Sequence, residues 1–331
     1  MTRFSDEALD RVVVETGGRV HLGFYRPCAA GGWVLGGVGV AVDGVGFRVA
    51  AERADTISVE GCDVDRLRAA AEAAARSFGL RGLRVHADTC IPRHVGLGST
   101  TQLWLAVHTA AAVLAGKGVE EAVKAAGRSR LSGVGVGVFL WGGLVADTGL
   151  RGGRPGTVAP MTWTPLPREW TILAVLPRVE GWRVEEGAEE EATVLQAALR
   201  AGGGGCSRAV EALVSKVYPG AATGDFDLFT EGLEDIEAAT AAAFSGSQPG
   251  GAYCCSETRL AAEELRRAGG RAVGQSSWGP LAYAWYPTLG EAEEAAERLR
   301  RRLPRGWRLL LLRPRPRGAR VEPRPAPPPR P

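Results

Sequence analysis

A glycine-rich turn that leads directly into an apolar helix constrains this chain more than any other segment. It reads PRHVGLGSTTQLWLAVHTAAAVLAG and covers 92–116. Pro92 restricts Ile91 to extended geometry, so a strand is expected to end at that point. Gly96 and Gly98 permit positive φ angles, which a tight turn often requires. The segment therefore predicts a strand, a tight turn and a helix in immediate succession.

The residues after the turn predict a capped, buried helix whose start attracts anions. Ser99 is expected at the N-cap, and Gln102 three residues later would complete a capping box. Residues 103–115 are apolar on nearly every face, which predicts a central helix. Main-chain N–H groups and the helix dipole together form an anion site at such a start. A capped core helix without a ligand is the alternative, but the three consecutive hydroxyl residues Ser99, Thr100 and Thr101 favour a phosphate.

Alternating and amphipathic segments divide the 331 residues into two folded units and a tail. Strand-like alternation covers 11–60, and an alanine-rich helix is expected at 63–78. Beyond residue 155 a buried strand is followed by helices, a strand pair, a helix and a last strand, which is typical of an antiparallel sheet covered by helices. Because single cores rarely exceed about 250–300 residues, we expect an α+β protein with domains at 1–155 and 156–312.

The last segment, 313–331, differs in composition from the rest of the chain. It contains six Arg and one Glu, so its net positive charge is larger than the +3 of the whole chain. The remaining residues are therefore slightly acidic overall. The segment has too few apolar residues to form a core and is predicted to be disordered. Because the folded part lacks a basic excess, no nucleic-acid partner is expected.

Cysteine usage and hydropathy predict a cytoplasmic protein. The six cysteines lack the CxxC or Cys–His spacing of a metal site, and reduced thiols are expected. The N-terminus has charges where a signal peptide would be apolar, and no apolar run is long enough to span a bilayer, so no membrane partner is expected. A homodimer is expected because two-fold dimers are the commonest oligomers.

Several motifs, in order along the chain, resemble those of one family. PRHVGLGSTTQ resembles the phosphate loop of the GHMP kinase superfamily. GRVHLGFY, GGVGVAVD, SGVGVGVFLWGGLVADTG, QPGGAY and VGQSSWGP are similar to motifs of the archaeal beta-ribofuranosylaminobenzene 5'-phosphate synthases. The last motif discriminates best, because kinases of the superfamily usually carry a glycine-rich loop there. The resemblance implies a GHMP-kinase-like N-terminal domain and a ferredoxin-like α/β sandwich as the C-terminal domain.

The same resemblance implies an enzyme of methanopterin biosynthesis. Members of this family are decarboxylating pentosyltransferases that join phosphoribosyl pyrophosphate to 4-aminobenzoate or 4-hydroxybenzoate and release carbon dioxide and pyrophosphate. No phosphoryl group is transferred, so the glycine turn would hold either the pyrophosphate or the 5'-phosphate. The sequence leaves open which phosphate it holds and which of the two benzoates is the acceptor.

Three kinds of side chain are expected to serve this reaction. Cationic donors that stabilise departing pyrophosphate are expected at Arg19, His21 and Arg93. Asp147 is the acidic residue nearest the motifs and is the candidate for a catalytic role or for holding Mg²⁺. Trp278 is expected to stack on the aromatic acceptor. The other expected binding residues supply hydroxyl, amide or main-chain groups: Gly96, Gly98, Ser99, Thr100, Thr101, Gln102, Ser132, Gly133, Gln275, Ser276 and Ser277.

Four of the residues given a chemical role also have a purely structural interpretation. Arg19 could be a solvated strand residue, and His21 a buried imidazole with satisfied hydrogen bonds. Trp278 could pack between the domains. Asp147 could end a turn before Gly149. The sequence leaves these alternatives open.

Two other functions fit part of the pattern. An ATP-dependent small-molecule kinase would share the fold, but many kinases of the superfamily carry a carboxylate where this chain has the apolar segment 134–136, and none follows until Asp147. A non-catalytic protein that binds a phosphorylated metabolite would keep the fold without the chemistry. Retention of GRVHLG together with GQSSWGP argues against that interpretation, so the sequence favours the synthase.

Overall fold

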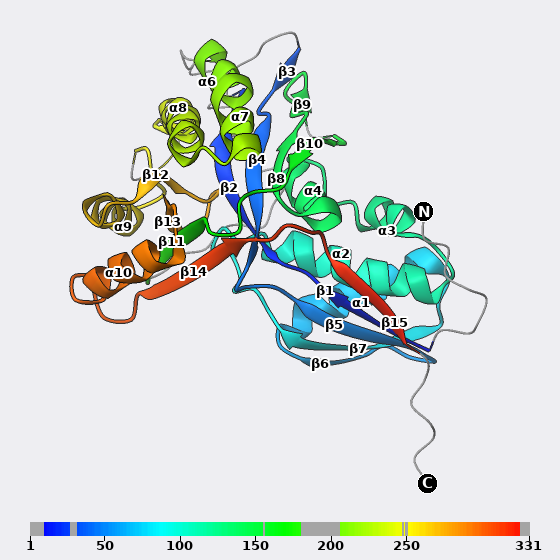
Figure 1. The fold of residues 1–331 in the computed structure, drawn as a ribbon. Helices are drawn as coiled ribbons and strands as arrows, with labels where there is room; N and C mark the ends of the chain where they lie inside the picture. The colour runs from blue at the N-terminus through cyan, green and yellow to red at the C-terminus, as the bar shows by residue number, and fades with distance from the viewer. Residues whose placement is uncertain are drawn as a thin grey trace.

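A computed structural model describes residues 10–26, 32–154, 156–179, 206–246, 248 and 251–324 (Figure 1). These residues form a five-stranded sheet, an eight-stranded sheet and a two-stranded ribbon, with helices packed on both large sheets. The α+β class expected from the sequence is confirmed. Among the helices in these ranges, none combines the length and the apolar character needed to cross a membrane.

The five-stranded sheet and its helices form the part of the fold that holds the glycine turn. Its strands, in spatial order, are β15 (Arg320–Arg324), β1 (Arg11–Glu15), β5 (Arg48–Ala54), β7 (Gly82–Thr89) and β6 (Ser58–Gly61). Helix α2 (Ser99–Leu114) packs on β1 and β5, and α1 (Val64–Phe78), α3 (Val119–Ala126) and α4 (Val134–Trp141) surround it (Figure 1). Helix α2 is therefore buried on nearly every face, as its apolar sequence predicts.

The eight-stranded sheet runs through the expected domain boundary near residue 155. Strand β14 (Arg308–Pro314) pairs with β4 (Gly37–Asp43) on one side and with β11 (Thr171–Leu176) on the other, so one sheet contains strands from both halves. The remaining strands of this sheet are β10 (Pro160–Thr164), β8 (Leu144–Asp147), β2 (Gly18–Phe24), β13 (Ala282–Tyr286) and β12 (Arg271–Gln275). The ribbon pairs β3 (Trp33–Val34) with β9 (Leu150–Arg151).

Strand β11 shows how the C-terminal half is layered. Alternate side chains of a strand point to opposite faces. Ile172 and Ala174 belong to the core cluster that contains α8 (Phe226–Phe244), whereas Leu173 and Val175 belong to the cluster with α9 (Ser256–Arg267) and α10 (Leu289–Arg300). Both faces are buried, which explains the uninterrupted apolar run of the strand. Before α8 the chain forms α6 (Cys206–Ala212), a π-helical turn at Leu213–Val217 and α7 (Tyr218–Thr223).

The prediction that 313–331 is disordered is wrong for its first part. Strand β14 extends to Pro314, and β15 then pairs antiparallel with the whole length of β1. Main-chain hydrogen bonds hold the two strands together, and these do not require apolar side chains. The low apolar content of the segment therefore did not predict the strand. Val321 adds a partly buried side chain to the core, and the guanidinium of Arg315 donates to Asp43 at 2.7 Å. Residues 325–331 lie outside the described ranges.

Candidate active site

Three motifs that are far apart in the sequence meet at the hydroxyl of Ser276. The main-chain N–H of His21 in β2 donates to Ser276 Oγ at 2.9 Å, and Ser276 Oγ donates to the carbonyl of Gly96 at 2.6 Å. Ser276 is fully buried and its hydroxyl is engaged on both sides. It therefore joins the segments GRVHLG, VGLGST and GQSSWGP, and it is not available to bind a substrate as the sequence predicted.

The two glycines of the turn are required by close packing as well as by backbone angle. Gly96 and Gly98 have φ angles of +91° and +74°. A Cβ at Gly96 would lie 2.2 Å from the carbonyl oxygen of Ser276, and a Cβ at Gly279 would lie 2.3 Å from the Gly96 nitrogen. Side chains at either position would separate the glycine turn from the segment that carries Trp278.

The start of α2 differs from the capping box predicted for it. The N-cap is Gly98, and Ser99 is the first helical residue. With Gly98 as the N-cap, Gln102 is the fourth helical residue and is not placed to close a capping box. Its side chain donates to the carbonyl of Gly135 in α4 at 2.9 Å. A Cβ at Gly135 would lie 2.9 Å from Thr101, so α2 and α4 approach closely at this end. Gly98 has a left-handed backbone, which glycine adopts without strain.

Arg66 is a neighbour of the glycine turn that the sequence did not reveal. Its guanidinium donates to Ser99 Oγ at 3.2 Å and to Thr100 Oγ1 at 2.9 Å. Asp63 holds it in place by accepting from its Nε at 2.7 Å. Burial raises the pKa of Asp63, but the ion pairs with Arg66 and Arg93 outweigh that effect and lower it. The signal was the i, i+3 spacing between Asp63, the N-cap of α1, and Arg66 in the first turn of that helix.

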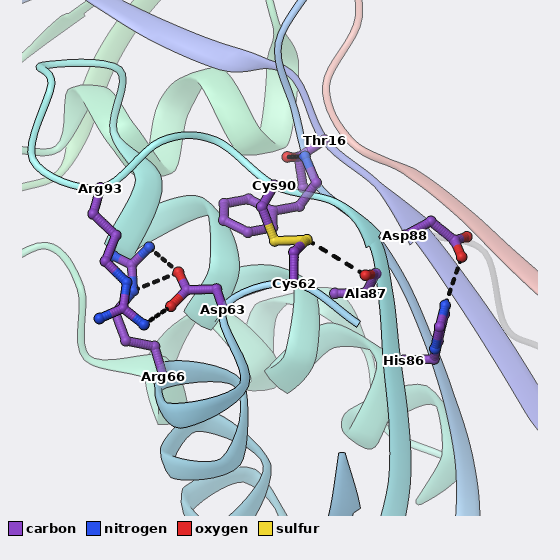
Figure 2. Close-up of a disulfide and its surroundings, with 10 residues drawn as sticks. Thr16, Cys62, Asp63, Arg66, His86, Ala87, Asp88, Cys90 and Arg93 are labelled. Atoms are coloured by element: carbon purple, nitrogen blue, oxygen red, sulfur yellow. Dashed lines mark hydrogen bonds and ion pairs between the residues drawn. A yellow bond between two sulfur atoms is a disulfide. The ribbon is translucent and has the colours of Figure 1, made fainter. Parts of the chain in front are cut away.

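Arg93 lies on the side of this cluster that faces solvent. Its guanidinium pairs with Asp63 and its side chain is about half exposed (Figure 2). It does not line the cavity described below. The ion pair with Asp63 helps to position the glycine turn, and a contact between Arg93 and a departing phosphate stays a prediction.

A disulfide lies beside the same ion pairs. Cys62, which precedes Asp63, is bonded to Cys90, which precedes the glycine turn (Figure 2). The expectation of reduced thiols is therefore wrong for this pair, because the fold brings β7 and the start of α1 together. Cys254 and Cys255 are free thiols.

Asp147 has the structural role that the sequence left as an alternative. Its Oδ1 accepts from the main-chain N–H groups of Gly37 and Gly149, both at 2.9 Å. Its Oδ2 accepts from Ser132 Oγ at 2.8 Å and from the N–H groups of Gly133 at 2.7 Å and Val134 at 3.2 Å. Burial raises the pKa of Asp147, and these hydrogen bonds oppose the rise.

The same contacts test whether Asp147 fits a metal ion. The side chain is fully buried, and both of its oxygens already accept hydrogen bonds from the protein. Hard cations such as Mg²⁺ need free oxygen ligands. Across the described ranges, no group of three or more His, Cys, Asp and Glu side chains is placed to hold a metal. Asp147 therefore does not fit the catalytic or metal-binding role predicted for it.

A partly open cavity of about 80 Å³ lies beside the contacts of Ser276. It contains several residues predicted from the sequence, namely Arg19, His21, Ser132, Gln275, Ser277 and Trp278. Arg19 connects it to the glycine turn, because the Arg19 N–H donates to the carbonyl of Leu97 at 3.0 Å. The turn itself does not line the cavity. The two predicted subsites are thus neighbours that share Arg19.

Aromatic rings form one wall of the cavity. The ring of Phe244 lies 5.5 Å from that of Phe24 and 5.1 Å from that of Trp278, which meets it edge to face. Gln275 Nε2 donates to the carbonyl of Ser277 at 2.8 Å and so fixes the loop that carries Trp278. Such a wall suits a planar apolar ligand. Trp278 also packs edge to face on Phe244 of α8, and its stacking on an aromatic acceptor stays a prediction.

Two titratable side chains in the cavity, His21 and Glu237, have strongly shifted pKa values. Burial, followed by the positive charge of Arg19, lowers the pKa of His21 to about 3. His21 is therefore neutral at physiological pH and cannot act as the predicted cation. Burial raises the pKa of Glu237 to about 8, although Tyr283 and Arg266 oppose the rise.

Glu237 is the cavity residue that sequence reasoning missed. It lies in α8 among several other acidic residues, most of which are solvent-facing. Its signal was its position, four residues after Leu233 and three before Thr240, on the helix stripe that faces the core. An acidic residue on an apolar stripe is a stronger site candidate than one on a charged face.

Comparison with known proteins agrees with this architecture. Residues 65–143 match the family model of the GHMP kinases N-terminal domain, and 217–305 match that of the GHMP kinases C-terminal region. The chain has the GHMP kinase fold. The predicted architecture of a GHMP-type domain with a ferredoxin-like α/β sandwich is thereby confirmed.

Solved structures with the GHMP kinase fold match over nearly the whole chain. Mevalonate pyrophosphate decarboxylase from Streptococcus pyogenes has a TM-score of 0.68 at 13% identity, with 94% of this chain and 99% of that chain covered. Homoserine kinase from Cytophaga hutchinsonii has a TM-score of 0.62 at 16% identity, with 97% and 100% covered. At these identities the likeness concerns the fold alone.

Two relatives are similar to this chain in sequence. The beta-ribofuranosylphenol 5'-phosphate synthase of Archaeoglobus fulgidus is 27% identical over 237 residues, which cover 68% of this chain and 74% of the relative. The protein of the same name from Methanocaldococcus jannaschii is 30% identical over 159 residues, which cover 43% and 48%.

Proposed function

We propose that this protein is an enzyme, a decarboxylating pentosyltransferase that makes a ribofuranosylbenzene 5'-phosphate. It would condense phosphoribosyl pyrophosphate with 4-hydroxybenzoate or 4-aminobenzoate, with release of carbon dioxide and pyrophosphate, in methanopterin-type biosynthesis. The names of the two relatives support the class of product. The observation that carries the proposal is the aromatic cavity that adjoins the glycine turn through Arg19.

The arrangement suits attack by a ring carbon on a ribose phosphate. Main-chain N–H groups at the start of α2, with Arg66 behind Ser99 and Thr100, form an electropositive end for a phosphate group. Arg19 stands between that end and the aromatic wall and remains a cation at every physiological pH. A ring held against the wall would meet the ribose carbon next to Arg19, and positioning supplies much of the rate in such a reaction.

The alternative of a small-molecule kinase is disfavoured by Asp147. The first carboxylate that follows Ser132–Gly133 in the sequence belongs to this residue. Its two oxygens accept five hydrogen bonds and have no contact with the cavity. A general base must reach the proton that it removes.

A labelled-substrate assay tests the proposal. With phosphoribosyl pyrophosphate and carboxyl-labelled 4-hydroxybenzoate or 4-aminobenzoate, labelled carbon dioxide should appear only when both substrates are present. ATP consumption with a small alcohol, and no release of label with either benzoate, would contradict it.

Two matched variants then locate the acceptor. Trp278→Ala should raise the KM for the benzoate with little change in the KM for phosphoribosyl pyrophosphate. Trp163→Ala, which removes an exposed ring from β10, is the control and should behave as the parent. Equal behaviour of both variants would place the acceptor elsewhere.

A further inference from the structure

The carboxyl group of Glu237 is built into the cavity by residues from three elements. It projects from α8 towards β12 and β13, where the hydroxyl of Tyr283 donates to its Oε1. A Cβ at Gly274 would lie 2.0 Å from the same oxygen, so the absence of a side chain there makes room for it. The strand therefore accommodates this carboxyl specifically.

The cavity is lined by a cation, Arg19, and by a carboxyl group, Glu237. Arg19 lies beside the glycine turn, because its main-chain N–H and its guanidinium donate to Leu97 and Gly96. Glu237 is the acidic residue among those that line the cavity. A 4-hydroxybenzoate has complementary ends, with its carboxylate and its hydroxyl on opposite carbons of the ring. If the carbon that bears the carboxylate meets the ribose near Arg19, the hydroxyl points away from the glycine turn.

We infer that Glu237 is the proton acceptor for the 4-hydroxyl group of the benzoate substrate, an assignment that rests on the proposed function. The carboxylate of Glu237 takes the hydroxyl proton, and the O–H electron pair moves into the ring. The ring carbon that bears the carboxylate forms a bond to the ribose C1, while the C1–O bond breaks and its electron pair leaves with pyrophosphate. The bond to the carboxylate then breaks, carbon dioxide departs, and its electron pair restores the aromatic ring as a phenolate. Protonated Glu237 returns the proton to that oxygen.

The environment of Glu237 matches this task. Burial raises the pKa of Glu237 to about 8, close to the range in which a phenol loses its proton. With a raised pKa the carboxyl is protonated below that value and becomes a base above it. Activity with 4-hydroxybenzoate should therefore rise as the pH passes through about 8.

The titratable groups near Glu237 come from three neighbouring elements. Tyr283 of β13 and Arg266 of α9 act on its carboxyl group, and Arg19 and neutral His21 of β2 line the same cavity. Burial, followed by the charge of Glu237, raises the pKa of Tyr283 well above its usual value, so its hydroxyl stays protonated and continues to donate.

The other elements packed on α8 direct their charges elsewhere. Lys216 of the π-helical turn and Arg208 of α6 pair with Asp235, and Lys216 also pairs with Glu231. Arg271 of β12 pairs with Asp227 and Glu234, and Tyr218 of α7 contacts Thr162. These groups do not contact Glu237.

Kinetics with both benzoates test the assignment. Glu237→Gln should lower kcat with 4-hydroxybenzoate by about 10²–10³-fold and abolish the rise through pH 8. The loss with 4-aminobenzoate should be at least about tenfold smaller, because the amine pushes electrons into the ring without first losing a proton. Glu231→Gln on the exposed side of α8 is the control and should match the parent with both substrates.

A second variant keeps the test decisive if Glu237→Gln folds poorly. Tyr283→Phe removes the hydrogen bond that favours the Glu237 carboxylate, so the alkaline rise of the parent should move to higher pH. An unchanged profile in Tyr283→Phe, or equal losses with the two benzoates in Glu237→Gln, would overturn the role of Glu237 while leaving the synthase in place. A parent that converts neither benzoate would overturn the proposed function and the inference together.

Discussion

Opening the disulfide between Cys62 and Cys90 should destabilise the protein by a predictable amount. The bond closes a segment with a sequence separation of 28. A loop of that length loses about 3.5 kcal/mol of chain entropy on cross-linking near room temperature. Reduction should therefore increase the unfolded-to-folded ratio by about 400-fold. The bond ties the end of β7, just before the glycine turn, to the start of α1, so the effect should be largest in that region.

Urea unfolding followed by tryptophan fluorescence measures this difference. The parent should unfold at lower urea concentration when reductant is present, and the double variant Cys62→Ser with Cys90→Ser should unfold like the reduced parent. Reductant should leave the double variant unchanged, which controls for effects on other thiols. Equal unfolding midpoints for the oxidised and reduced parent, with the thiols shown by titration to be open, would refute the reasoning.

Two further predictions concern the residues that the structure reassigns. Asp147→Asn replaces an acceptor of five hydrogen bonds by an amide whose N–H groups must face main-chain N–H groups. Urea unfolding should show that the free energy of unfolding falls by about 3 kcal/mol. A loss of activity at unchanged stability would instead restore Asp147 as a catalytic residue. A chain that ends after Ala319 lacks β15 and exposes the edge of β1. Size-exclusion chromatography should show that this chain associates, whereas a control chain that ends after Arg324 should not. Identical elution of the two chains would argue against the pairing of β15 with β1.

Local pattern predicted much of the fold. The apolar run after the glycine turn predicted a central helix, and α2 is that helix. The alternating and amphipathic segments beyond residue 155 predicted the strands of the C-terminal half and the helices that cover both faces of β11. Strand β15 was not predicted because main-chain hydrogen bonds to β1 hold it in place. Such bonds leave no periodic pattern of apolar residues in the sequence.

The site was predicted in part, and the limits have a physical origin. Arg19, Gln275, Ser277 and Trp278 were expected at the site and line the cavity. Ser276 was assigned to the substrate, but its hydroxyl bonds groups that are 255 and 180 residues away in the chain. Glu237 was missed because its chemistry depends on burial against Tyr283 and on the space left by Gly274.

The sequence by itself determined the order of the elements, the glycine turn before a buried helix and the motifs typical of GHMP proteins. These depend on periodicity and on backbone preferences over a few residues. Only the tertiary structure decided which candidates meet, that His21 is neutral, that Asp147 organises a turn and that Glu237 faces the cavity. Those properties arise from burial and from contacts between distant segments, so they exist only once the chain has folded.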